Sequence, residues 1–99
     1  MSANELIAHD RMLVGAIDSF MGSVVHTRPF LASAYREQLE RMAERWINEG
    51  GPNALAAVTS EWLHSYLASA EEPEKAELAV RELYTWALHE ELIAASPLS

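Results

Sequence analysis

Apolar residues along the chain recur every three or four positions, as on one face of an α-helix, and they nowhere alternate as in a half-buried strand. Three breaks interrupt this pattern, at Arg28-Pro29, Gly50-Gly51-Pro52 and Glu72-Pro73. Proline suits the first turn of a helix, and glycine suits the residue that stops one. The pattern therefore predicts four helices, over about residues 4–25, 29–49, 53–70 and 73–95.

Four helices of this length, joined by short turns, predict one compact all-α domain over residues 1–99. An up-down bundle is the expected arrangement, and an orthogonal arrangement of the same helices is the alternative. The helix expected over 53–70 has one charged residue, Glu61. A helix so poor in charge is usually covered on much of its circumference, so we expect it at the centre of the domain or at an oligomer interface.

The first predicted helix carries small residues at a spacing of seven, Ala8, Gly15 and Gly22. Glycine inside a helix costs about 1 kcal/mol relative to alanine. The close approach of another helix backbone is a physical reason for glycine there, and we predict such a contact. The alternative is that the spacing has arisen by drift and carries no packing role.

The last predicted helix is apolar around most of its circumference. Its apolar residues are Leu78, Val80, Leu83, Tyr84, Trp86, Ala87, Leu88, Leu92 and Ile93. One face cannot bury all of these side chains, which predicts self-association through this helix. We expect the aromatic residues in the core, with Trp86 as the first exception, because its helix has apolar residues to spare.

Seven basic and fifteen acidic residues give the 99-residue chain a formal net charge of −8. Nucleic-acid binding needs basic contacts to phosphate, so this charge argues against it. Arg36, Arg41 and Arg45 fall on one side of the second predicted helix, but glutamates interleave with them, which is typical of a solvated, salt-bridged face. Residues 71–99 hold seven acids and two bases, a net −5, which suits a basic protein partner or a second copy of the chain.

Two groups of residues have some metal-ligand character. Glu61 and His64 form a Glu-x-x-His pair, the spacing found in ferritin-like di-iron bundles, but such sites need the pair twice and a homodimer would have to supply the second copy. In an up-down bundle His9 and His89 would lie at one level, each beside a carboxylate in the chain. We favour a solvated polar surface for both groups, so we expect no metal and no other cofactor.

Other kinds of chemistry lack their residues. The chain has no cysteine, no Gly-x-Ser-x-Gly turn and no phosphate-binding glycine loop. The first residues lack the basic start and apolar run of a signal peptide, and no apolar run approaches the ~20 residues of a membrane span. We therefore expect a soluble, cytoplasmic protein without a membrane partner, and the excess of arginine over lysine points weakly to a bacterial source.

The leading hypothesis is a small acidic helical module that binds another protein, as an adaptor, regulator or inhibitor, and that acts as a homo-oligomer, most simply a homodimer. The residues expected at its partner-binding surface are Trp86, Leu92, Glu82 and Glu90. The alternative is a ligand- or metal-binding helical bundle, with or without enzymatic activity. A nucleic-acid mimic is a third, weaker option, because the last helix alone offers unneutralised acids.

Overall fold

The computed structural model describes residues 9–98. Four α-helices follow one another, α2 (Leu13–Thr27), α3 (Pro29–Asn48), α4 (Ser60–Ser69) and α5 (Pro73–His89), and a 3-10 helix, η1 (Leu55–Ala57), precedes α4. Residues 9–11 form one helical turn before α2, and the predicted start of the first helix, at residue 4, lies outside the described residues. No strand occurs within residues 9–98, and the predicted all-α class is confirmed. In the same range, no helix is both long enough and apolar enough to cross a membrane.

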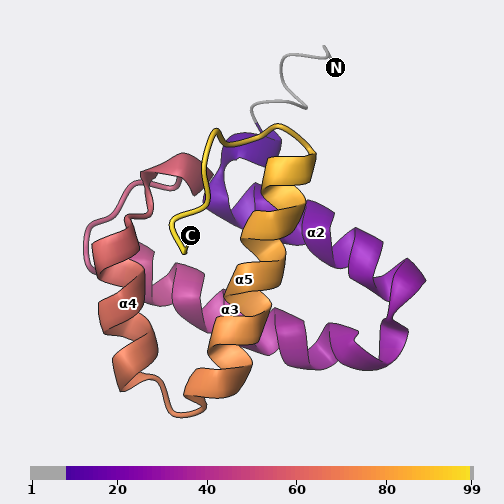
Figure 1. Cartoon of the computed structure of the whole chain (residues 1–99), viewed down its shortest axis with the longest axis horizontal. Coiled ribbons are helices and arrows are strands. Elements are labelled where there is room, and N and C mark those ends of the chain that lie inside the picture. Colours follow the sequence, from indigo (N-terminus) through magenta and orange to yellow (C-terminus); the bar gives the residue numbers. More distant parts are fainter. Residues whose placement is uncertain (1–8, 99) are drawn as a thin grey trace.

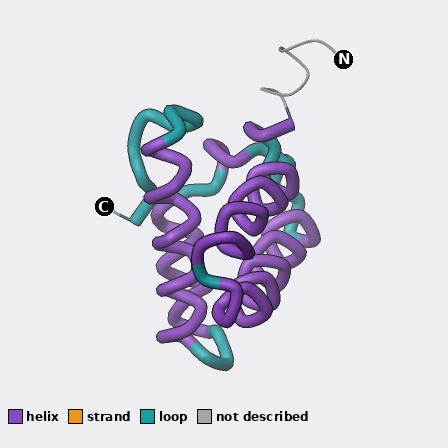
Figure 2. The backbone as a smooth tube through the Cα atoms, turned by 90° about the vertical axis from the view of Figure 1, so that its right-hand side faces the viewer, coloured by secondary structure: helices purple, strands orange, loops and turns teal. Residues whose placement is uncertain are grey.

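The helices form two antiparallel pairs that cross each other (Figure 1). α2 and α3 run side by side, and α4 and α5 run across them, with α5 in contact with both. The view turned by 90° agrees, because the second pair is seen from the side while α2 and α3 point toward the viewer (Figure 2). The up-down bundle is therefore not confirmed, and the crossed pairs correspond to the orthogonal alternative.

A single residue, Arg28, joins α2 to α3. Its backbone (φ −144°, ψ 64°) lies outside the helical region, as expected for a residue that precedes proline. Pro29 takes the first position of α3, where the missing N–H would have no helical acceptor in any case. α5 begins in the same way at Pro73. Both helices thus begin at the prolines that the sequence indicates.

The helix predicted over 53–70 is shorter in the structure, because the chain leaves the helical conformation before α4. Val58 has extended dihedrals, and the Thr59 side chain caps α4 by accepting a hydrogen bond of 3.1 Å from the backbone N–H of Trp62. The threonine side chain accepts a hydrogen bond from a backbone N–H of the first turn, and this bond favours the start of a new helix at α4 over one continuous helix. α4 is also not the centre of the domain, because only Leu63 and Tyr66 of its ten residues are buried.

The core lies where α5 crosses α2 and α3. Its fully buried large side chains come from all parts of the fold and are Leu13, Met21, Val24, Leu39, Met42, Leu55, Leu63, Val80, Leu83 and Tyr84. Tyr84 is the largest of them, and its hydroxyl donates a hydrogen bond of 3.2 Å to the carbonyl oxygen of Leu55. Burial raises the pKa of Tyr84, so the hydroxyl remains a donor across the physiological range.

Most of the apolar surface of α5 is covered within the chain. Its side chains at Val80, Leu83 and Tyr84 are buried, and Trp86 is partly buried against the core. Of its large apolar residues, Leu78 is 49% exposed and Leu88 is 38% exposed. The exposed apolar surface of α5, from which the sequence predicts self-association, is therefore smaller than expected. Three helices, α2, α3 and α4, cover α5 instead of one.

α5 ends at His89 and not near residue 95. The N–H of Glu91 donates to Leu88 and the N–H of Leu92 donates to Ala87, at 3.0 and 2.9 Å, with Glu91 in the left-handed region at φ 59°. This is a Schellman cap, in which glycine is the usual left-handed residue. α3 ends with the same two bonds around Gly50, at φ 93°. After the turn the chain folds back, and Ile93 and Leu98 pack against the core.

The glycines of α2 have different surroundings. A Cβ atom at Gly15 would overlap the carbonyl group of His9, which belongs to the helical segment just before α2. A Cβ atom at Gly22 would have no heavy atom within 4 Å. The predicted helix contact is therefore wrong at Gly22, and at Gly15 the approaching backbone is local. Ala8 lies outside the described residues.

Replacing Gly22 with alanine is expected to raise the free energy of unfolding by about 1 kcal/mol, because alanine loses less backbone entropy in a helix and nothing occupies the added volume. Urea denaturation followed by circular dichroism measures the change. The matched control, Gly15→Ala, is expected to destabilise the protein, because its methyl group meets the His9 carbonyl. A loss of stability in Gly22→Ala would show that another chain or segment covers this position.

Candidate functional site

One side of α5 carries most of the residues expected at a partner-binding surface. Leu78, Glu82, Trp86 and Glu90 are spaced by four positions, so they lie along one side of the helix, and we call them the α5 stripe. Leu78 and Glu90 are exposed, whereas Glu82 and Trp86 are partly buried. The stripe therefore alternates apolar and acidic side chains from one helical turn to the next.

The middle of the α5 stripe contacts the other pair of helices. The ring of Trp86 lies 5.8 Å from that of Phe20 on α2, and the Glu82 carboxylate pairs with Arg28 at 3.5 Å. The Arg28 guanidinium also lies over the ring of Tyr35, at 5.7 Å from its centroid. Trp86 is thus held on one side by the core while its other side faces out, an arrangement that allows contact with a partner at little cost in side-chain entropy.

Leu92 does not join the α5 stripe. It follows the left-handed residue Glu91, and its backbone is bonded into the cap of α5. Its side chain is partly buried and packs against the core. The apolar pattern predicts a helix that continues to residue 95 and includes Leu92, and the turn at Glu91 is the reason that Leu92 lies elsewhere.

Part of the acidity of residues 71–91 is neutralised within the chain. Glu72 pairs with Lys75 at 2.8 Å, which lowers the pKa of Glu72, and Glu77 pairs with Arg81 at 2.9 Å. Three carboxylates of this segment, those of Glu74, Glu90 and Glu91, have no ion-pair partner among residues 9–98. These carboxylates give the free negative charge on and after α5.

The histidines do not gather into a metal site within the described residues. Glu61 and His64 are exposed on α4, and His9 and His89 are also exposed. Within residues 9–98, no group of three or more histidine, aspartate or glutamate side chains is arranged so that it could hold a metal ion. The shared level of His9 and His89 depends on an up-down bundle, which the structure does not confirm, so it stays a prediction.

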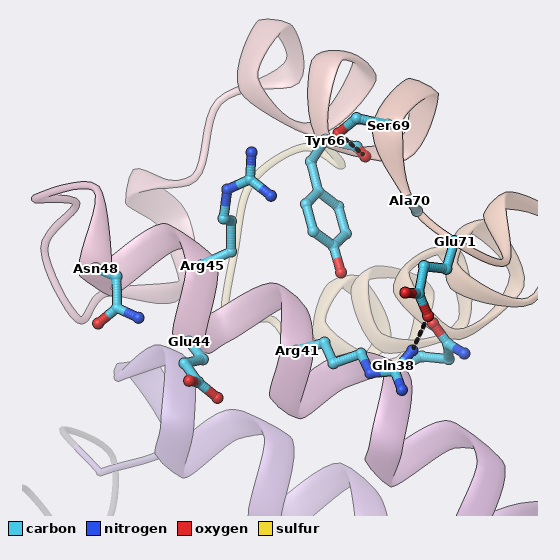
Figure 3. Close-up of a pocket in the computed structure, with 9 residues that line it drawn as sticks. All are labelled: Gln38, Arg41, Glu44, Arg45, Asn48, Tyr66, Ser69, Ala70 and Glu71. Carbon is cyan, nitrogen blue, oxygen red and sulfur yellow. Dashed lines mark hydrogen bonds and ion pairs between the residues drawn. The ribbon is translucent and has the colours of Figure 1, made fainter.

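A groove between α3 and α4 was not found by sequence reasoning. It has a volume of about 420 Å³ and is lined by Gln38, Arg41, Glu44, Arg45, Asn48, Tyr66, Ser69, Ala70 and Glu71. The side chains of Arg45 and Tyr66 point into the space between the two helices, with the Tyr66 hydroxyl directed toward α3, whereas Arg41 extends along α3 toward Glu71 (Figure 3). One signal in the sequence was Gln38, a polar residue at a core-facing position of α3, where it is buried.

Three aromatic rings form the wall behind this groove. Tyr66 stacks on Trp62 with centroids 5.3 Å apart and an angle of 7°, and Trp62 meets Trp46 edge-on at 5.1 Å. The Trp62 indole N–H donates to Glu49 at 3.1 Å, and Glu49 also accepts a hydrogen bond from Arg45. These two donors lower the pKa of Glu49, with Trp62 as the larger cause. The wall therefore fixes the position of Tyr66 and of Arg45 together.

Comparison of the chain with protein-family models, with curated proteins and with solved structures finds no match. The functional proposals below are therefore based on the geometry of the α5 stripe and of the α3–α4 groove.

Proposed function

We propose that this protein is a small protein-interaction module that binds a basic, amphipathic helix of another protein along the α5 stripe. The observation that carries the proposal is the alternation of Leu78, Glu82, Trp86 and Glu90 on one side of α5. A helix laid against this side would place apolar residues on Leu78 and Trp86 and a basic residue on Glu90, while Glu82 keeps its ion pair with Arg28. Its role would be that of an adaptor, regulator or inhibitor, and no catalytic step is part of it.

Charge favours a basic partner over a second copy of the chain. Each copy carries a formal net charge of −8, so two copies repel each other at long range, whereas a basic segment is attracted. Tryptophan at a partly covered position is also typical of the residues that dominate binding energy. Self-association through α5, expected from the sequence, remains a separate proposal, which light scattering over a range of concentrations measures directly.

The test uses a synthetic amphipathic peptide of leucine and lysine as the probe, labelled for fluorescence anisotropy. Glu90→Gln and Leu78→Ala are each expected to weaken binding about fivefold, the effect of losing ~1 kcal/mol of contact energy. The matched controls are Glu61→Gln, which removes another exposed carboxylate without an ion-pair partner among residues 9–98, and Ile47→Ala, which shortens another exposed apolar side chain. Neither control is expected to change the affinity by more than about twofold.

Two outcomes would contradict the proposal. If the peptide does not bind at low salt, the α5 stripe is not a site for basic helices. If Glu61→Gln weakens binding as much as Glu90→Gln does, the attraction comes from net charge alone and the stripe has no special role. The alternative function, a ligand-binding helical domain, is favoured by one observation, the groove between α3 and α4.

A further inference from the structure

The Tyr66 hydroxyl lies in the α3–α4 groove and has no side chain or backbone group of residues 9–98 as a hydrogen-bond partner. Tyr66 is only 9% exposed. The hydroxyl oxygen itself is accessible from the groove, because no buried side-chain oxygen or nitrogen within residues 9–98 lacks a hydrogen-bond partner. The hydroxyl points across the groove toward α3 (Figure 3).

Two arginines on consecutive turns of α3 line the same groove. Arg41 holds Glu37 tightly, at 2.8 Å through Nη2, and Glu71 loosely, at 3.8 Å through Nη1. Arg45 uses its Nε atom for Glu49. A guanidinium has five N–H donors, so each arginine retains donors for a ligand.

Both arginines act on the phenol of Tyr66. Burial raises the pKa of Tyr66, while the charges of Arg41 and Arg45 oppose that rise. The phenol therefore stays protonated at neutral pH, and positive charge lies within electrostatic reach of it. The phenol O–H and the N–H groups that the two arginines retain are donors that line one groove, and Glu71, an acid of the same lining, reaches Arg41 only at 3.8 Å. Such a set of donors suits an anion.

From this geometry we infer that the α3–α4 groove binds an oxyanion, a carboxylate or phosphate group carried by a small ligand, between the Tyr66 hydroxyl and the guanidinium groups of Arg41 and Arg45. The groove volume of about 420 Å³ falls in the range of small-molecule sites. The side-chain amide of Gln38 is held at the same groove by Glu72, at 3.2 Å. This site shares no residue with the α5 stripe, so either proposal can fail without the other.

Glu71 has a defined part in this site as a competitor. Its carboxylate is 86% exposed and reaches Arg41 at the outer limit of an ion pair. A bound oxyanion would take the Nη1 group of Arg41 from it. Removing the Glu71 charge should therefore strengthen ligand binding, whereas removing either arginine should weaken it.

The test compares benzoate, phenyl phosphate and the uncharged benzamide as probes, with affinity measured by NMR titration of the full chain. We expect binding of at least one anion, weakened about tenfold or more by Tyr66→Phe and by Arg41→Gln, the loss of one charge-assisted contact. Glu71→Gln should tighten binding by a few-fold. Tighter binding of phenyl phosphate would assign the site to phosphate ligands, and tighter binding of benzoate would assign it to carboxylates.

Three matched variants separate the site from general effects of charge and folding. Tyr35→Phe also removes a hydroxyl that has no hydrogen-bond partner among residues 9–98, but outside the groove. Arg36→Gln removes an arginine on the α2 side of α3, and Glu74→Gln removes an exposed acid that does not line the groove. None of the three should change the affinity. Failure of both anions to bind, equal binding of benzamide, or unchanged binding by Tyr66→Phe with intact folding would each overturn the inference.

Discussion

Replacing Tyr84 with alanine is expected to lower the free energy of unfolding by about 3–5 kcal/mol, the usual cost of removing a large aromatic side chain from a core. Tyr84 is fully buried and is the largest of the fully buried side chains. Its hydroxyl also ties α5 to η1 through the Leu55 carbonyl. A domain of this length has a total stability of roughly 5–15 kcal/mol, so this change removes a large share of it.

Urea denaturation, with the slope of unfolding compared between variants, measures this effect. Tyr84→Phe keeps the ring and removes the hydrogen bond, so we expect a cost of about 1 kcal/mol. Leu78→Ala is the control on the same helix, and it should cost less than about 1 kcal/mol, because Leu78 is half exposed. If Tyr84→Ala cost no more than Leu78→Ala, the assignment of Tyr84 to the centre of the core would be wrong.

The starts and ends of several helices can be predicted from the sequence, because proline and glycine restrict the backbone at their own positions. Proline fixes its own dihedrals and restricts the residue before it, so α3 and α5 begin at Pro29 and Pro73 whatever surrounds them. Gly50 ends α3 because its left-handed dihedral strains other residues. Glu91 ends α5 in the same conformation without being glycine, and a local rule that looks for glycine therefore extends this helix too far.

The arrangement of the helices depends on contacts between distant residues, and this is where sequence reasoning was insufficient. The apolar pattern of α5 shows that it is covered but not by which helices, and the crossed pairs cover it with α2, α3 and α4 together. The α3–α4 groove has the same origin. Arg41 and Tyr66 are distant in the sequence, and the charges on α3 alone predict a solvated surface, whereas in the structure α4 contributes the other side of the groove.

Some of the acidic residues that give the chain its negative net charge contact other side chains of the same chain. Glu71, Glu72 and Glu82 contact side chains of the α2–α3 pair, namely Arg41, Gln38 and Arg28. These acids therefore help to join the two crossed pairs, and they are not all available to a partner. Of the acids left without an ion-pair partner among residues 9–98, Glu74, Glu90 and Glu91 lie on or just after α5, and Asp10, Glu44 and Glu61 lie elsewhere. The unpaired acids therefore do not form the extended row that a mimic of a nucleic acid would need.

Replacing Gly51 with alanine is expected to cost about 3 kcal/mol, the upper part of the range for overpacking. A Cβ atom at Gly51 would overlap the indole ring of Trp46, so the indole has to move. That movement would break the hydrogen bond of 2.8 Å from its Nε1 atom to the Pro52 carbonyl and disturb its edge-on contact with Trp62. Because the wall behind the groove starts at Trp46, near-ultraviolet circular dichroism should change as well.

The neighbouring glycine separates steric overlap from backbone strain. Gly50 has φ 93° and open space around its Cβ position, so Gly50→Ala should cost only about 1 kcal/mol through strain. In a Trp46→Leu background the ring that Gly51→Ala displaces is absent, and its cost should fall below about 1 kcal/mol, whereas the cost of Gly50→Ala should not change. If the cost of Gly51→Ala were the same in both backgrounds, the overlap with Trp46 could not be its cause, and the packing of the indole against this turn would be wrong.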